Sequence, residues 1–149
     1  MPIHRIQLKG PWEYEWLSPG SGPLGRTDGN PHSERTGRVT MPADWVSLFG
    51  ELSGTVRFRR RFHRPTNLDP HERVFVAFAA IGGTGTVSVN GTEIGRLSTS
   101  SEVQRFEMTN VLKPFSELTV ELEFVLERDG QPGGLWSVVA IEIDGGAAD

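Results

Sequence analysis

Ser116 to Leu126 reads SELTVELEFVL, and this stretch decides the fold. Every second residue from Leu118 to Leu126 is apolar, and the residues between them are mostly polar. A period of two is typical of a β-strand with one buried face and one wet face, whereas a helix would scatter the same residues around its circumference. The segment 116–126 is therefore predicted to be a strand.

The same alternation recurs along the chain. Apolar residues alternate with glutamates in 12–16 and with arginines in 56–62. Residues 86–89 lead into Asn90-Gly91, a strong hairpin signal because both residues accept the positive φ of a type I′ turn. About eight or nine short strands at roughly ten-residue spacing imply a sandwich or a barrel. We predict an all-β protein, a β-sandwich whose single domain covers residues 1–149.

Composition and length exclude several classes of protein. The 149 residues include 18 glycines, 10 prolines and no cysteine, and the formal net charge is −4. The lack of cysteine excludes disulfides and thiolate metal sites, and the negative charge argues against nucleic-acid binding. No apolar run approaches the roughly 20 residues of a membrane span, and the N-terminus lacks a secretory signal. We expect a soluble, cytoplasmic protein with no nucleic-acid or membrane partner.

Local composition also predicts the segments that interrupt the strands. Residues 18–37 are rich in Gly, Pro, Ser and Asp, which predicts a long, flexible surface loop, and residues 144–149 are predicted to be a frayed tail. Residues 73–81 are apolar on both faces and are predicted to be a central strand. Asp44 is a suitable N-cap for a short helical turn over 45–49, where the apolar residues have helical spacing.

Motifs that resemble functional signatures have simpler explanations here. Gly20–Gly25 matches the dinucleotide pattern G-x-G-x-x-G, but it lies among prolines and no helical period follows it. Asn90-Gly91-Thr92 matches a glycosylation acceptor, which the hairpin turn explains. The four histidines lack metal-ligand spacing, and no G-x-S-x-G elbow is present. We therefore predict no cofactor and no metal site.

The arginines of 57–64 divide between the two faces of their predicted strand. Arg57, Arg59 and Arg61 share one face, and Arg60 falls on the apolar face. No stacking aromatic lies on the arginine face, which argues against a single-stranded nucleic-acid site. A charge inside a sheet must be paired, so we predict that Arg60 meets a carboxylate, with Glu142 on the last strand as one possibility.

Six short motifs follow one another in an order that is more specific than any of them alone. They are Gly10–Tyr14 (GPWEY), Val39–Trp45 (VTMPADW), Phe58–Phe62 (FRRRF), Val87–Gly95 (VSVNGTEIG), Phe106–Leu112 (FEMTNVL) and Gly133–Val138 (GGLWSV). Together they resemble the N-terminal sugar-binding domain of glycoside hydrolase family 2 enzymes, a galactose-binding-like jelly roll. The resemblance implies this fold and carbohydrate chemistry nearby. The family's Gly-Gly-aromatic stretch is replaced by Ser98–Glu102, and we expect the chain to lack the separate barrel that carries the family's catalytic carboxylates.

The candidate site follows from how loops alternate in an antiparallel sandwich. The loops 42–53, 82–85, 98–102 and 127–134 are predicted to share one end. Sugar recognition uses an aromatic face together with hydrogen-bonding groups that match hydroxyls. We predict ligand contacts from Asp44, Trp45, Ser98, Ser100, Glu102, Arg128, Asp129 and Gln131. By the resemblance, Asp129 occupies the place of a residue that points toward the sugar, whereas Trp45 and Trp136 could instead be core or corner packing.

These observations predict a non-catalytic, carbohydrate-binding-like module. The alternative is a protein-interaction or accessory subunit of a separately encoded glycoside hydrolase, with no sugar affinity of its own. An enzyme is not expected, because most carboxylates, such as Glu13 and Glu121, stand at outward strand positions rather than as a pair on a pocket floor. The expected partner is a carbohydrate or another protein chain.

Overall fold

The computed structural model describes residues 4–21, 36–50, 53–65, 68, 70–125 and 133–145. These residues form ten β-strands, one α-helix and one 3-10 helix. The elements are β1 (His4–Gln7), β2 (Trp12–Ser21), β3 (Thr36–Val39), α1 (Trp45–Phe49), β4 (Ser53–His63), β5 (Arg73–Phe78), β6 (Thr84–Val89), β7 (Thr92–Leu97), β8 (Gln104–Glu107), η1 (Thr109–Val111), β9 (Phe115–Phe124) and β10 (Val139–Asp144).

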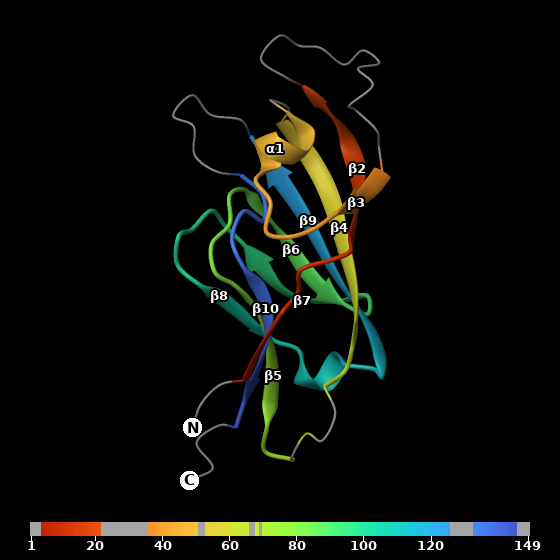
Figure 1. Ribbon diagram of the computed structural model, residues 1–149, viewed down its shortest axis with the longest axis vertical. Coiled ribbons are helices and arrows are strands. Elements are labelled where there is room, and N and C mark those ends of the chain that lie inside the picture. The colour runs from red at the N-terminus through yellow and green to blue at the C-terminus, as the bar shows by residue number, and fades with distance from the viewer. Residues whose placement is uncertain are drawn as a thin grey trace.

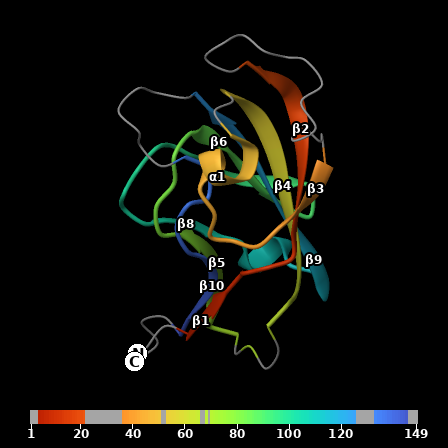
Figure 2. The ribbon, with the colours of Figure 1, turned by 45° about the horizontal axis from the view of Figure 1, so that its top comes forward.

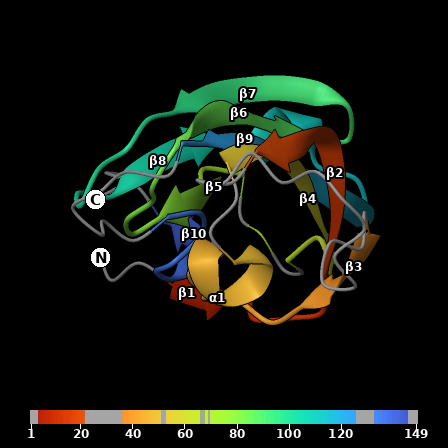
Figure 3. The same cartoon turned by 90° about the horizontal axis from the view of Figure 1, so that it is seen from above.

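The strands form two antiparallel sheets that face each other (Figure 1). One sheet has the order β1-β10-β5-β8, and the other has the order β3-β2-β4-β9-β6-β7. Figure 3 shows the six-stranded sheet curving around, with α1 on the side where β10 and β3 lie. The predicted all-β jelly-roll sandwich is confirmed.

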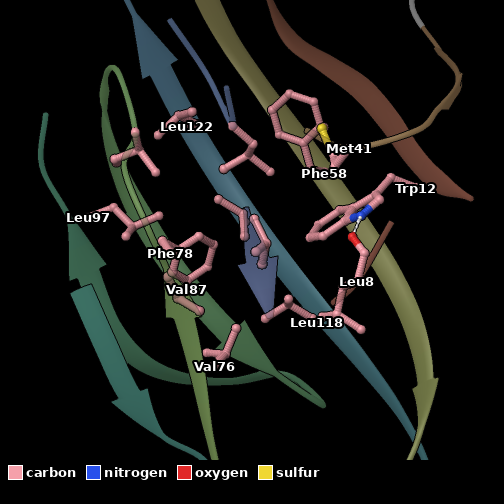
Figure 4. Close-up of a cluster of buried hydrophobic side chains, with 14 of the residues drawn as sticks. Leu8, Trp12, Met41, Phe58, Val76, Phe78, Val87, Leu97, Leu118 and Leu122 are labelled. Carbon is pink, nitrogen blue, oxygen red and sulfur yellow. Dashed lines mark hydrogen bonds between the residues drawn. The ribbon is translucent and has the colours of Figure 1, made fainter. Parts of the chain in front are cut away.

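The hydrophobic core fills the space between the sheets (Figure 4). Phe58 of β4 and Leu118 of β9 come from one sheet, and Val76 and Phe78 of β5 come from the other; all four are fully buried. Burying one such side chain stabilises the folded state by about 1.5–3 kcal/mol. The two inward faces therefore account for most of the driving force that brings the sheets together.

The alternation that predicted the strands matches their burial. β9 runs from Phe115 to Phe124, and its even-numbered residues are buried from Ser116 onward. β5 lies between β10 and β8, as expected of a central strand. The described residues hold ten strands rather than eight or nine; β1, β3 and β8 have only four residues each, and β3 and β8 alternate between exposed and half-buried positions.

The predicted hairpin joins β6 to β7 through Asn90 and Gly91. Both residues have positive φ, 53° and 85°, as a type I′ turn requires. The Asn90 side-chain nitrogen donates to the Val111 carbonyl at 2.7 Å, and its oxygen accepts from the Glu117 N–H at 3.0 Å. The Asn-Gly-Thr sequence is therefore explained by the turn and by these bonds.

Two predicted boundaries differ from the structure. The flexible loop predicted over 18–37 is strand at both ends, because β2 continues to Ser21 and β3 begins at Thr36. Residues 22–35, including most of the G-x-G-x-x-G match, lie outside the described residues. The predicted tail begins with Asp144, which is the last residue of β10, and residues 146–149 also lie outside.

The arginines of β4 divide between the two faces as predicted, but the predicted partner of Arg60 is wrong. Glu142 lies in register with Arg5 and is bound by Arg5 and Arg105, both at 2.7 Å. Its neighbour Ile141 faces the core, so strand alternation directs Glu142 to the outer face of the four-stranded sheet. A side chain on that face cannot reach the interior position of Arg60.

Arg60 instead bonds locally. One of its terminal nitrogens donates to the Arg61 carbonyl, and its Nε is buried without a hydrogen-bond partner within the described part of the chain. Burial lowers the pKa of the Arg60 guanidinium from its ordinary value, because desolvation disfavours the charged form. On the outer face, Arg57 pairs with Glu15 at 3.4 Å and with Glu121 at 2.9 Å.

Candidate functional site

Four segments meet at the end of the sandwich where α1 lies (Figures 1 and 2). We call them the rim and define it as residues 44–45, 82–83, 98–102 and 133–134. They all lie within the loops that were predicted to share one end. Hydrogen bonds join them in the order α1, 133–134, 82–83 and 98–102, so the predicted gathering of these loops is confirmed for the described residues.

The start of α1 holds both backbone polar groups of Gly133. The Gly133 N–H donates to the Asp44 carboxylate at 3.0 Å, and the Gly133 carbonyl accepts from the Trp45 N–H at 2.9 Å. The helix begins directly after Asp44 as predicted, but the expected side-chain N-cap is wrong, because the carboxylate makes no bond to the helix amides. A side-chain cap is worth about 1 kcal/mol, and the bond to Gly133 takes its place.

Gly133 and Gly134 fit between aromatic rings and the neighbouring strand. A Cβ added to Gly133 would lie 2.5 Å from the Phe124 ring, and Gly134 has a φ of +71°, which disfavours other residues. Gly134 also exchanges two backbone hydrogen bonds with Gly82, at 2.8 and 3.0 Å. The two glycines thus allow residues 133–134 to lie between the start of α1 and the β5–β6 connection.

The Ser98–Glu102 loop is tied to the same connection. The Thr99 hydroxyl accepts from the Gly83 N–H at 2.8 Å and donates to the Gly83 carbonyl at 3.2 Å. Ile81 and Ser100 exchange backbone hydrogen bonds at 3.0 and 3.1 Å. These contacts place the loop beside the glycines of the rim.

Side chains of the loop also fix its shape. The Gln104 side chain accepts from the Ser98 N–H at 3.2 Å and donates to the Ser98 carbonyl at 2.8 Å. The Ser100 hydroxyl accepts from the Glu102 N–H at 2.9 Å. The exposed side chains of Ser98, Ser101 and Glu102 make no hydrogen bond within the described residues, so their polar groups remain accessible.

Trp45 does not contribute an exposed aromatic face. Its ring is fully buried, at edge-on distances of 5.5 Å from Trp16 and 5.0 Å from Phe49, and it lies 5.2 Å from Phe124. The prediction that Trp45 contacts a ligand is therefore wrong in this structure, and the alternative of core packing is confirmed. The physical reason is that α1 covers the open end of the core, so its apolar side chains turn inward.

Trp136 is the tryptophan that sequence reasoning undervalued. The other three tryptophans are buried, whereas Trp136 is half-buried. It follows Leu135, which is buried and whose carbonyl accepts from the Ala43 N–H at 3.0 Å. No local pattern distinguishes Trp136 from the buried tryptophans, because Leu135 and Ser137 are bends and β10 begins only at Val139.

The remaining predicted contacts divide into two groups. Ser98, Ser100 and Glu102 are brought together on one loop, although the Ser100 hydroxyl is already used within it. Arg128, Asp129 and Gln131 lie in the segment 126–132, outside the described residues, and they stay predictions.

Several charged groups of the described chain form ion pairs on the sheet faces. Glu15, Glu121 and Glu142 each pair with arginine, and no group of three or more His, Asp or Glu side chains forms a potential metal site within the described ranges. Of the two helical elements there, α1 has five residues and η1 has three, and neither is long enough to cross a membrane.

Comparison with known proteins gives matches among solved structures alone. No protein-family model and no curated protein matches the sequence. An FMN-binding β-glucuronidase from Facaelibacterium prausnitzii L2-6 is similar with a TM-score of 0.73 and 22% identity, over 95% of this chain and 22% of that chain. A putative β-galactosidase from Bacteroides fragilis is similar with a TM-score of 0.72 and 19% identity, over 96% of this chain and 23% of that chain.

A β-glucuronidase from Ruminococcus gnavus, in complex with uronic deoxynojirimycin, is similar with a TM-score of 0.71 and 15% identity, over 95% of this chain and 29% of that chain. The chain thus spans 22–29% of the length of these three proteins. The resemblance that six short motifs predicted is confirmed at the level of the fold, the β-sandwich that this chain shares with parts of these β-glucuronidases and of the putative β-galactosidase.

Proposed function

We propose that this chain is a non-catalytic, carbohydrate-binding-like module whose rim contacts a saccharide. The observation that carries the proposal is the fold, which matches parts of two β-glucuronidases and a putative β-galactosidase over 95–96% of this chain. The names of those proteins denote action on glycosides. At this level of identity the analogy is one of fold, so the case for a ligand depends on the chemistry of the rim.

The rim offers groups that suit a polyhydroxylated ligand. The hydroxyls of Ser98 and Ser101 can donate and accept, and the Glu102 carboxylate accepts hydrogen bonds from sugar hydroxyls. Trp136 is half-buried and follows Gly134 by two residues, and we propose that its exposed part supplies apolar surface for sugar C–H groups. Because Thr99 and Gln104 already hold the loop in shape, binding would cost little ordering entropy.

The arrangement of carboxylates supports a non-catalytic role. Glycoside hydrolysis needs two carboxyl groups that flank the bond at a separation of about 5–10 Å. Glu15 and Glu121 share one arginine on an outer sheet face, and Glu142 lies between two arginines on the other sheet. Each of these carboxylates is therefore committed to a structural pair.

A titration followed by nitrogen–proton NMR tests sugar binding directly. Methyl glycosides of galactose, glucose and glucuronic acid are added at millimolar concentration. We expect saturable shifts at the amides of Ser98–Glu102 and Gly133–Gly134. Glu102→Gln should weaken binding about tenfold, because a charged acceptor makes the stronger hydrogen bond.

The matched control for Glu102→Gln is Glu93→Gln. Glu93 is exposed and lies next to the hairpin turn on β7, outside the rim. The control should leave affinity unchanged. Absence of saturable shifts across the panel, or equal loss in both variants, would contradict sugar binding at the rim.

A second candidate function is docking to a separately encoded glycoside hydrolase. It is favoured by the hydrogen bonds within the rim. Asp44, Thr99 and Ser100 already have partners there, so the surface has a fixed shape before a partner binds. Sedimentation velocity of this chain, alone and mixed with a family 2 catalytic domain from the same organism, tests the idea. Docking predicts a faster-sedimenting complex that Glu102→Lys weakens, and an unchanged monomer boundary would oppose it.

A further inference from the structure

Asp44 occupies the N-cap position of α1, but its carboxylate binds another segment of the chain. The residue has the extended backbone of an N-cap, with φ −72° and ψ 141°, and Trp45 begins α1. Its side chain nevertheless makes no bond to the helix amides and accepts instead from the N–H of Gly133 at 3.0 Å. Asp44 and Gly133 are 89 positions apart in sequence, so this bond joins two distant parts of the rim.

Gly133 depends on such contacts for its position. It has no side chain, and a Cβ would collide with the Phe124 ring at 2.5 Å, so packing of its own side chain cannot hold it. Its N–H is held by Asp44 and its carbonyl by the Trp45 N–H. The start of α1 thus fixes both polar groups of this residue.

The position of Gly133 is passed on to the rest of the rim. Gly134 exchanges backbone hydrogen bonds with Gly82, and Gly83 is bonded twice to the Thr99 hydroxyl. Between α1 and the Ser98–Glu102 loop, the connection consists of backbone bonds, including Trp45–Gly133 and Ile81–Ser100, together with one side-chain contact at each end. Asp44 is the side chain at the α1 end.

We infer that Asp44 is a positioning residue for the rim, acting through Gly133, rather than a residue that touches the ligand. This inference deepens the proposed function and depends on it for the identity of the ligand. The carboxylate holds 133–134 against 82–83, and this contact keeps the Ser98–Glu102 loop in its binding shape. Asparagine at position 44 keeps an oxygen that can accept from Gly133, whereas alanine removes the acceptor.

Amide hydrogen exchange in the ligand-free protein tests the coupling without any sugar. Asp44→Ala should accelerate exchange at the Gly133 amide about tenfold, with a smaller rise at Gly82 and Gly83, because a hydrogen bond to a charged acceptor is lost. Asp44→Asn should stay near the wild-type rate. Core amides such as those of Val76 and Val120 should be unchanged in both variants.

Asp44→Ser serves as a second variant if Asp44→Ala does not fold. Serine is a good N-cap but is too short to keep the contact with Gly133, so the start of the helix is maintained while the coupling is lost. Faster exchange at Gly133 in this variant supports positioning. Unchanged exchange at Gly133 in both the alanine and serine variants would overturn the inference.

The affinities of the Asp44 variants for the galactose, glucose and glucuronic acid glycosides then distinguish a positioning role of Asp44 from direct contact with the sugar. Positioning predicts weaker binding in Asp44→Ala and rescue in Asp44→Asn. Equal loss of affinity in both variants, with the asparagine variant exchanging normally at Gly133, would mean that the charge touches the sugar and would overturn the inference. If the wild-type chain binds none of the glycosides, the proposed function fails, and the exchange measurements alone decide whether Asp44 controls the rim.

Discussion

Replacing Trp45 by alanine distinguishes a core role from a ligand-contacting role. The ring is fully buried and lies 5.5 Å from Trp16, 5.0 Å from Phe49 and 5.2 Å from Phe124. The ring projects from α1 toward the core and covers its end. Its loss should therefore lower the free energy of unfolding of the whole domain, whether or not a ligand is present.

The magnitude follows from the volume removed. Deleting a buried tryptophan or phenylalanine side chain costs about 3–5 kcal/mol, and we expect about 4 kcal/mol because a five-residue helix can relax only partly into the cavity. Domains of this size have a free energy of unfolding of about 5–15 kcal/mol. With a urea m-value of about 2 kcal/mol/M, the unfolding midpoint should fall by about 2 M.

Urea unfolding followed by far-ultraviolet circular dichroism measures this shift, since the signal does not depend on tryptophan fluorescence. Trp136→Ala is the matched control, because the same side chain is removed from a half-buried position. It should cost less than half as much. If the midpoints of the two variants agree within about 0.5 M, the assignment of Trp45 to the core would be refuted.

Three further substitutions test other parts of the fold by the same urea assay. Glu142→Gln should cost about 2 kcal/mol, less than the 3–5 kcal/mol of a fully buried pair, because Arg5 and Arg105 keep access to water. Arg60→Met should leave stability unchanged or raise it by about 1 kcal/mol, because it removes a buried Nε that has no partner; a clear loss would contradict this. Asn90→Ala should cost about 2–3 kcal/mol through lost hydrogen bonds and the positive φ, and Asn90→Gly, which keeps the turn, should recover part of it.

Most of the sheet architecture was predictable because side-chain burial follows the pleat. The period-two pattern identified β9, and Asn90-Gly91 identified the β6–β7 turn, since few other residue pairs accept positive φ at both positions. The same alternation correctly placed Arg60 on the inner face of β4. The same alternation directs Glu142 outward, because its neighbour Ile141 is buried in the core.

The site was less predictable, because residue type does not reveal which side of a short helix faces the core. Trp45 suits a sugar-binding surface and a core position equally well in residue type, although its helical spacing with Leu48 and Phe49 puts it on the apolar face that the structure buries. Asp44 has the sequence position of an N-cap, and its bond to Gly133 depends on a tertiary contact that no local pattern encodes. Long-range contacts of this kind override local preference.

Two of the six motifs that carry the family resemblance build part of the rim. Val39–Trp45 supplies Asp44 and Trp45, and Gly133–Val138 supplies the glycines that bond to them. Retaining these motifs is therefore explained by the fold without any ligand. Within the described rim, the accessible side chains without a hydrogen bond are those of Ser98, Ser101 and Glu102, in the loop where the sequence departs from the family's Gly-Gly-aromatic pattern. If this chain binds a sugar, its specificity should reside in that divergent loop, and exchanging the loop should change the ligand while leaving the stability of the sandwich intact.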